Sequence, residues 1–227
     1  MAKYIKLRET LEVRKSEDLI NASYMLSLLA MKMINFVIAN IDKDDSIDEK
    51  YAFRVLDFKE VLGTKSNQIY TNIPDILEEL LTNEIKIENK IIKGWISKGN
   101  YKEGIITVLI NPKLRPHLFK EKPIKYLLKH ILNIKSIYAI RMYELLTLFS
   151  YKFQSIIELD RLRKILHISD GYKYSQLKRG ILEYSKKELE KNTDIVFDYE
   201  EIKTWNKVTY LKFSIKQLEE EIIIPPI

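Results

Sequence analysis

The stretch YKYSQLKRGILEYSKKELEK, residues 172–191, decides the fold of the C-terminal half. Read at the 3.6-residue period of a helix, its apolar residues gather on one face. That face consists of Leu177, Ile181, Ser185 and Leu189, with Leu182 beside them. The opposite face carries cations and an amide, namely Lys173, Gln176, Arg179, Lys186 and Lys187. The stretch therefore predicts one amphipathic helix with a core-facing stripe.

Two further elements flank this helix. A short helical segment at residues 159–166 precedes it, across a polar break at 167–172. A two-stranded ribbon follows, at 195–199 and 208–215 with a turn at 203–206. Helix, turn, helix and ribbon in this order predict a winged helix, a helix-turn-helix variant whose last helix enters the major groove of DNA. An amphipathic, lysine-rich helix is also typical of an ordinary solvated surface, so this stretch alone does not establish DNA binding.

Composition sets broad limits on function. The 227 residues include 38 basic and 32 acidic side chains, a net charge of +6, which permits a polyanionic partner without requiring one. The absence of cysteine excludes disulfides, thiolate metal sites and thiol catalysis. The sequence opens without a signal-peptide core, and no apolar run is long enough to span a bilayer. We therefore expect a cytoplasmic protein.

The N-terminal half predicts a similar order of elements. Residues 1–18 are polar without a sustained period, and we expect them to form an N-terminal arm. Helices are predicted at 19–41 and 68–82, and an extended entry with a short helix between Phe53 and Gly63. Ser66 or Asn67 is the expected cap of the helix at 68–82. Pro74 means that this helix either starts near Ile73 or is kinked there. A three-stranded meander is predicted at 85–88, 91–97 and 105–110. Each ribbon of the chain contains one tryptophan, Trp95 or Trp205.

Three prolines, Pro112, Pro116 and Pro123, make residues 111–123 the expected domain boundary. We predict an α+β, mainly α chain of two tandem winged-helix domains at 19–120 and 121–227. The second domain is expected to begin with helices at 124–132 and 136–151. The tail EEEIIIPPI at 219–227 is expected to be an extended strand or arm.

No arrangement of residues typical of an enzyme is present. The histidines His117, His130 and His167 are far apart, and a lone histidine is usually a core or surface residue. The sequence has no P-loop and neither of the motifs G-x-G-x-x-G and G-x-S-x-G. The acidic run at 42–50 lacks the glycine of a calcium-binding loop. We expect a binding protein without catalytic residues, metal or cofactor.

Several segments resemble the iteron-binding initiators of theta-replicating plasmids. Residues 19–27, LINASYMLS, are similar to that family's opening helix, and Trp95-Ile96-Ser97 to its first ribbon. The segment 136–146, SIYAIRMYELL, is the most characteristic. The second helix-turn-helix is matched by Leu159, Leu162, Arg163, Leu166, Tyr174, Lys178 and Leu182. The resemblance runs from about residue 17 to 215 and departs at Ala30, where an acidic residue is expected.

The resemblance implies a bacterial, plasmid- or nucleoid-associated protein that binds specific DNA sequences. Monomers would bind direct repeats, called iterons, at a plasmid origin. Dimers joined through the first domain would bind an inverted repeat and repress their own gene. Recruitment of the host initiator and replicative helicase, and opening of an AT-rich region, are also implied. Two other functions stay open: a transcription regulator with the same fold, and a scaffold that never touches DNA.

The expected contacts follow from the way recognition helices work, since a few side chains near the helix N-terminus read bases while most others bind phosphates. In the second domain, Tyr174, Gln176 and Arg179 are expected to read bases, Arg179 at guanine and Gln176 at adenine. The phosphate candidates are Lys173, Lys178, Lys186, Lys203 and Lys207. The first-domain candidates are Lys65, Ser66, Asn67 and Gln68, with Lys93 and Lys98 from the ribbon. Each lysine could equally be a solvated surface charge.

Overall fold

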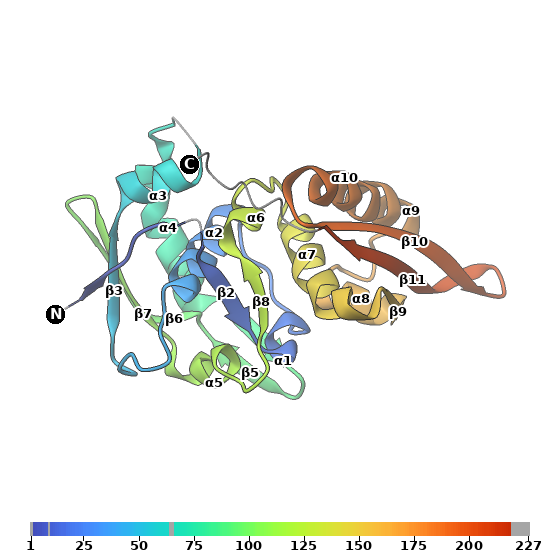
Figure 1. The fold of residues 1–227 in the computed structure, drawn as a ribbon, viewed down its shortest axis with the longest axis horizontal. Helices are drawn as coiled ribbons and strands as arrows, with labels where there is room; N and C mark the ends of the chain where they lie inside the picture. Colours follow the sequence, from blue (N-terminus) through green and yellow to red (C-terminus); the bar gives the residue numbers. More distant parts are fainter. Residues whose placement is uncertain (1, 9, 64–65, 219–227) are drawn as a thin grey trace, which may run out of the picture.

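The computed structural model describes residues 2–8, 10–63 and 66–218. Lys65, an expected DNA contact, and the tail at 219–227 lie outside the described residues. Figure 1 shows two lobes side by side, with helix α7 (Ile137–Phe149) placed between an N-terminal and a C-terminal sheet. Among the residues described, no helix is both long enough and apolar enough to cross a membrane.

The N-terminal lobe contains a sheet of strand order β1–β3–β7–β6. Its strands are β1 (Lys3–Tyr4), β3 (Lys50–Arg54), β6 (Ile96–Lys102) and β7 (Ile105–Ile110). A separate hairpin joins β4 (Glu84–Ile87) to β5 (Lys90–Lys93). The predicted meander is therefore wrong, because β5 and β6 belong to different sheets. The chain turns between them at Gly94, where φ is +81° and an added Cβ would lie 2.5 Å from the Leu81 carbonyl oxygen.

The described residues of the expected N-terminal arm include two paired strands. β1 pairs with β3, and β2 (Glu12–Lys15) pairs antiparallel with β8 (Ile124–Leu127). The second pairing places Val13 opposite Tyr126, and both side chains are buried. Because β8 follows residues 111–123, it attaches the chain beyond the expected boundary to the N-terminal lobe. Between β7 and β8 the chain forms two short helices, η1 (Pro112–Leu114) and α5 (Arg115–Leu118).

The prediction of a single helix at 19–41 is also wrong. The chain forms α1 (Glu17–Ile20) and α2 (Leu28–Ala39), separated by non-helical residues in which Ser23 forms a bridge to Lys86 of β4. Ser27 is the N-cap of α2, and its Oγ accepts a hydrogen bond from the Ala30 N–H at 3.3 Å. The same hydroxyl donates to Glu79. Polar capping, rather than the apolar period, therefore decides where the helix begins.

The next two helices agree with the prediction. They are α3 (Val55–Val61) and α4 (Gln68–Thr82). Pro74 lies inside α4, so this helix begins well before Ile73. Of the two expected caps, Asn67 takes the N-cap position but its side chain makes no capping hydrogen bond, while the Ser66 Oγ accepts from the Gln68 N–H at 3.2 Å.

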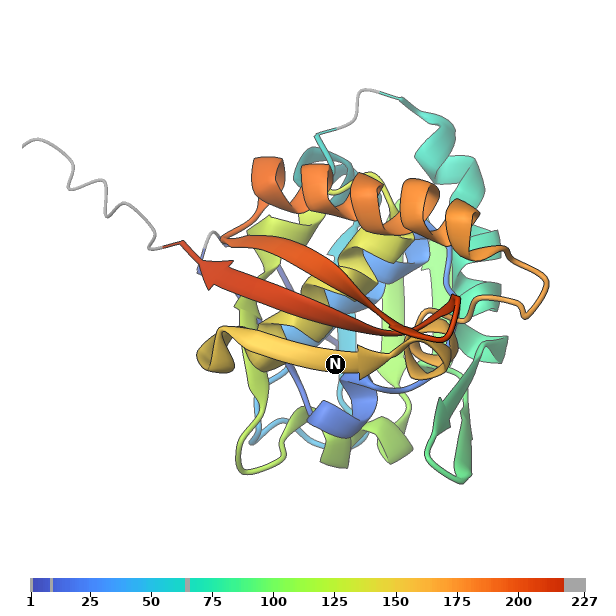
Figure 2. The same ribbon diagram turned by 90° about the vertical axis from the view of Figure 1, so that its right-hand side faces the viewer.

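The C-terminal lobe follows the predicted order from α7 onward. Of the residues 124–132 expected to form a helix, only α6 (Leu128–Leu132) is helical. After α7 come η2 (Ser150–Lys152), β9 (Gln154–Glu158) and α8 (Leu159–Ile165). The last helix consists of α9 (Tyr174–Leu177), a π-helical turn (Lys178–Leu182) and α10 (Glu183–Asn192). The ribbon strands are β10 (Ile195–Thr204) and β11 (Lys207–Gln217), and β9 pairs with β11 as a third strand. Figure 2 shows the last helix running above these three strands.

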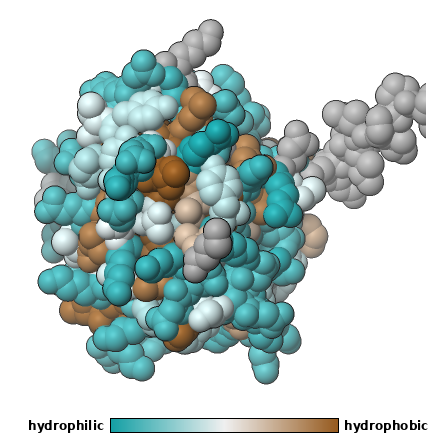
Figure 3. Space-filling view, turned by 90° about the vertical axis from the view of Figure 1, so that its left-hand side faces the viewer, coloured by the Kyte–Doolittle hydropathy of each residue, from teal (hydrophilic) through white to brown (hydrophobic). Residues whose placement is uncertain are grey.

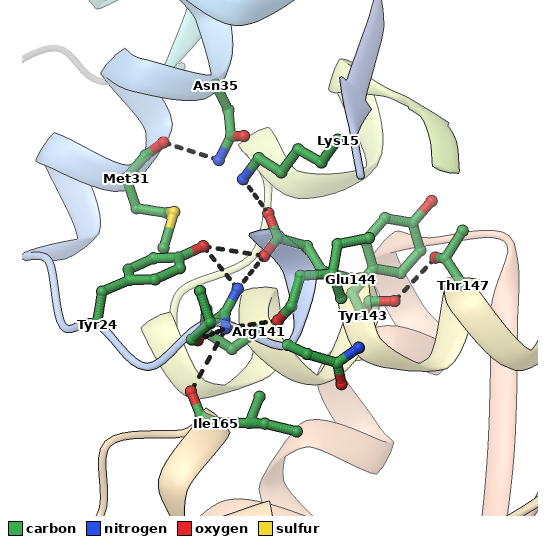
Figure 4. Close-up of polar contacts among 12 residues, drawn as sticks. Lys15, Tyr24, Met31, Asn35, Arg141, Tyr143, Glu144, Thr147 and Ile165 are labelled. Atoms are coloured by element: carbon green, nitrogen blue, oxygen red, sulfur yellow. Dashed lines mark hydrogen bonds and ion pairs between the residues drawn. The ribbon is translucent and has the colours of Figure 1, made fainter. Parts of the chain in front are cut away.

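A buried ionic cluster joins the lobes (Figure 4). Glu144 of α7 is fully buried, and its carboxylate accepts hydrogen bonds from Lys15 Nζ at 2.6 Å and Tyr126 OH at 2.7 Å. Arg141 Nη1, on the same helix, lies 2.6 Å from the second carboxylate oxygen. Lys15 comes from β2 and Tyr126 from β8, so the two paired strands of the N-terminal lobe meet α7 at this carboxylate.

Arg141 also donates hydrogen bonds to backbone carbonyl oxygens. Its Nη2 donates to the carbonyl oxygens of Ile20 and Ala22, both at 2.8 Å, in the stretch where the expected long helix is interrupted. It also reaches the carbonyl oxygen of Ile165 at 3.4 Å, at the end of α8. One guanidinium thus satisfies backbone carbonyls from both lobes.

Burial alone would raise the pKa of the Glu144 carboxyl, but the charges of Lys15 and Arg141 outweigh it and lower this pKa to about 2. Burial lowers the pKa of the Lys15 ammonium. The folded-state pKa of Glu144 lies below its ordinary value of 4.5, so the carboxylate stabilises the fold above that pH. Its contribution is lost as the pH falls from 4.5 toward about 2.

The Glu144→Gln variant should lower the free energy of unfolding by about 3–5 kcal/mol, because two buried cations lose their counter-charge. Lys15→Met is the matched control: it leaves Arg141 and Glu144 as a balanced pair and should cost less. Urea denaturation at pH 7 measures both. Between pH 4.5 and about 2, wild-type stability should fall more steeply than that of Glu144→Gln. Equal losses in the two variants at pH 7 would contradict this account.

Candidate nucleic-acid interface

The helix-turn-helix of the C-terminal lobe consists of α8 and the last helix, joined by residues 166–173. The predicted apolar stripe is confirmed, because Leu177, Ile181, Leu182, Ser185 and Leu189 are all buried. Gly180 lies on the other side, where an added Cβ would come within 3.2 Å of the Tyr172 hydroxyl oxygen. The last helix therefore turns one face to the core and leaves Ser175, Gln176, Arg179 and Lys187 exposed.

Gln176 has a structural role that the sequence did not reveal. Its Oε1 accepts a hydrogen bond from the backbone N–H of Lys173 at 2.9 Å, which closes the first turn of α9. Reading adenine needs the amide oxygen as well as the amide nitrogen. In this conformation the oxygen is occupied, so Gln176 is not arranged for the expected bidentate contact. The Lys173 side chain is exposed at the helix N-terminus.

Tyr174 is half-buried and packs against the hydrophobic core instead of projecting from the first turn. Burial raises the pKa of its phenol, and the neighbouring Glu201 carboxylate raises it further. This tyrosine packs the start of the helix against β10, which does not fit the expected role in base reading.

Two expected phosphate contacts are engaged by acids of β10. Lys178 Nζ lies 2.7 Å from Glu201, and Lys186 Nζ lies 2.9 Å from Asp198. A hydrogen bond from Lys178 lowers the pKa of Glu201, and one from Lys186 lowers the pKa of Asp198. These pairs hold the last helix against the ribbon, and their neutralised lysines offer less attraction to a phosphate.

Arg179 remains the strongest base-reading candidate. Its side chain is exposed, and among the described residues no acid pairs with it. Ser175 lies four positions earlier, so both side chains share one helix face. The sequence prediction missed Ser175, although its position in the first helical turn was the available signal. Together they form an unobstructed polar face beside the N-terminus of α9.

The ribbon brings Lys203 and Lys207 together. Thr204 pairs with Lys207 across a two-residue turn made of Trp205 and Asn206, and Lys203 pairs with Val208. Both lysines are exposed, as is Trp205. Trp205, absent from the expected contacts, lies at the tip of the ribbon between the two lysines.

The N-terminal candidates do not form one surface. Ser66, Asn67 and Gln68 lie at the start of α4, where Asn67 Oδ1 accepts a hydrogen bond from Lys59 at 2.7 Å. Lys93 lies beyond the other end of α4, which is about 22 Å long at 1.5 Å per residue. Lys98 lies on β6, in a different sheet from Lys93. In the described part of the chain, no three His, Asp or Glu side chains gather as ligands of a metal ion would.

Comparison with known proteins places these lobes in a family. A family model described as "Initiator Replication protein, WH1" matches residues 12–147, and one described as "Initiator Rep protein, WH2" matches residues 158–215. The gap between the two matched segments is at 148–157, whereas the prolines predict the boundary at 111–123. This difference agrees with the attachment of β8 to the N-terminal lobe.

Individual relatives are distant. A replication initiation protein of Escherichia coli is 23% identical over 195 residues, which cover 79% of this chain but only 62% of that relative. An uncharacterized 27.6 kDa protein of Escherichia coli is 21% identical over 216 residues, covering 85% of this chain and 90% of that protein.

A solved structure shares the fold. The crystal structure of Pi initiator protein in complex with iteron DNA is similar with a TM-score of 0.79 at 20% identity. The match covers 95% of this chain and 100% of that chain. The expected architecture of two winged helices is thus confirmed, and with both family models matched in order, the chain belongs to the family of initiator replication proteins.

Proposed function

We propose that this protein initiates plasmid replication by binding repeated sites, iterons, in duplex DNA at the origin. The observation that carries the proposal is the polar face of the last helix, where Ser175 and Arg179 are exposed without an acidic partner among the described residues. The exposed Lys203 and Lys207 of the ribbon belong to the same winged helix. The solved Pi initiator, which has the same fold, is in complex with iteron DNA.

In this proposal the last helix enters the major groove N-terminus first. Arg179 donates two hydrogen bonds to guanine O6 and N7, the commonest specific contact in protein–DNA complexes. Lys173, Lys203 and Lys207 bind phosphates and fix the register of the helix. Lys178 and Lys186 act indirectly rather than by contacting DNA, because their ion pairs set the angle between the ribbon and the helix.

A second part of the proposal concerns assembly. Dimers joined through the N-terminal lobe bind an inverted repeat and repress transcription of the gene, while monomers bind the iterons. Supporting this, Figure 3 shows apolar side chains among the hydrophilic ones on the face seen from the N-terminal lobe. In the four-stranded sheet of that lobe, Tyr4 of β1 and Ile105 of β7 are 44% and 42% exposed. The host initiator and replicative helicase then join the origin complex and open its AT-rich region.

The test is fluorescence anisotropy with three duplexes, an origin repeat, the inverted repeat upstream of the gene and a scrambled control, over a salt series. The proposal expects tighter binding to both repeats and a steep fall of affinity with salt. Binding to the inverted repeat alone would favour a transcription regulator. Equal binding to all three duplexes would indicate only a basic surface, and no binding would favour a scaffold.

The Arg179→Ala variant should weaken binding to the origin repeat by about 1–3 kcal/mol and relax the preference at one base pair, because one bidentate guanine contact is lost. Lys191→Ala, which removes an exposed cation at the far end of the same helix, is the matched control and should change little. Competition binding with singly substituted repeats measures both. An unchanged base preference in the Arg179 variant would refute the assignment.

The Lys207→Ala variant should weaken binding to every duplex alike and reduce the slope of log affinity against log salt by about 0.9, the value for one phosphate contact. Lys178→Ala should reduce the slope by less, because Glu201 already neutralises this lysine. Anisotropy at four or more salt concentrations gives the slopes. A Lys178 effect as large as the Lys207 effect would contradict the division between paired and unpaired lysines.

The Ile105→Lys variant should shift the protein toward monomer, because the added charge would be buried in the proposed dimer interface. Ile91→Lys is the matched control, since Ile91 is exposed on the β4–β5 hairpin away from the four-stranded sheet. Sedimentation velocity over a concentration series measures both. If the two variants dimerise as the wild type does, the interface lies elsewhere.

A further inference from the structure

The tip of the ribbon carries the most exposed large apolar side chain of the described residues. Trp205 is 95% exposed, whereas Trp95 is fully buried. The tip lies at the far end of the C-terminal lobe, where β10 and β11 extend beyond α8 and α9 (Figure 1). Within the described residues Trp205 packs against no core, so stability of the fold does not explain a tryptophan here.

The backbone makes the residue more unusual. Trp205 has φ +57°, in the left-handed region that a bulky side chain adopts only at a cost. Glycine or asparagine would fit this turn with less strain. A residue that neither packs nor suits its backbone points to a role outside the folded chain.

The two strands behind the tip are linked by a hydrogen bond, and its surroundings are positive. The hydroxyl groups of Thr204 and Thr209 lie 2.8 Å apart and link the two strands just behind the turn. Lys203 and Lys207 flank the tryptophan, and the acid close to them, Glu201, is paired with Lys178 at 2.7 Å. The tip therefore presents one apolar ring between two cations, carried on a hairpin.

This combination matches an apolar wedge for the minor groove of duplex DNA. That groove is about 6 Å wide and strongly negative where AT-rich. Side chains inserted between base pairs there unstack a step and kink the duplex, and flanking cations bind the phosphates on either side. Single-strand binding sites instead use several aromatic rings along a basic groove. One ring on a convex tip favours the duplex.

We propose that Trp205 enters the minor groove next to the site bound by the last helix and partly unstacks one base step, while Lys203 and Lys207 hold the flanking phosphates. This inference rests on the proposed function and deepens it. Pyrimidine–purine steps such as TA deform most easily, so the wedge selects them without hydrogen bonds to the bases. Each bound repeat would then be bent as well as recognised.

The experiment compares the wild type with Trp205→Asn, a variant whose side chain suits the left-handed turn and leaves Trp95 in place. Its melting temperature should equal or exceed that of the wild type. Tryptophan emission is recorded while the origin repeat is added to saturation, judged by anisotropy. Wild-type emission should be quenched and blue-shifted, since one of its two tryptophans leaves water. The variant's emission should not change.

The same duplex, labelled at both ends, reports bending by energy transfer, and 2-aminopurine at successive steps reports unstacking. The variant should bind roughly 5- to 150-fold more weakly, the range for losing one stacked aromatic, and should leave the duplex straighter. Saturating anisotropy without a change in wild-type emission, or equal bending by both proteins, would overturn the wedge and leave the proposed function intact.

Three further results have definite meanings. Quenching by single-stranded but not duplex DNA would replace the wedge with a single-strand contact. Failure to bind any duplex would overturn the wedge together with the proposed function. Tryptophan quenching together with a 2-aminopurine signal at one step per repeat would support the wedge and the proposed binding of repeats.

Discussion

The buried carboxylate of Glu144 is the constraint on which the arrangement of the two lobes depends. Lys15 of β2 and Tyr126 of β8 donate hydrogen bonds to it. Arg141 pairs with it and also donates hydrogen bonds to backbone carbonyls of both lobes. Desolvating such groups costs several kcal/mol each unless every partner is present. The cluster therefore favours one relative placement of the lobes over a range of placements, and α7 transmits that placement to the helix-turn-helix.

A second set of charges works at the surface. The pairs of Lys178 with Glu201 and Lys186 with Asp198 use four charges to hold the ribbon against the last helix. Exposed pairs contribute little to stability. Their larger effect is on the pattern of charge that remains, because Lys173 and Arg179 near the helix N-terminus and Lys203 and Lys207 near the ribbon tip are left exposed. In the proposed function, the paired lysines position the ribbon and the unpaired cations contact DNA.

Local signals in the sequence predicted the C-terminal lobe well, because the stripe of Leu177, Ile181 and Leu189 and the ribbon after it are short-range patterns. The N-terminal lobe was harder. Apolar spacing continues through residues 21–27, yet the Ser27 cap and the bonds from Arg141 break the helix there. The pairing of β2 with β8 joins residues about 110 positions apart, and no local pattern records it. Likewise, only the fold shows that Gln176 is a cap and that Lys178 has an acidic partner.

The most direct test of the central claim uses the absence of cysteine. A Ser175→Cys variant carries one thiol, to which an iron chelate that cuts DNA can be attached. On a duplex with several origin repeats, the account predicts cleavage at one fixed position in the major groove of every repeat. Cleavage spread evenly along the duplex, or none while anisotropy reports binding, would show that the last helix does not read DNA.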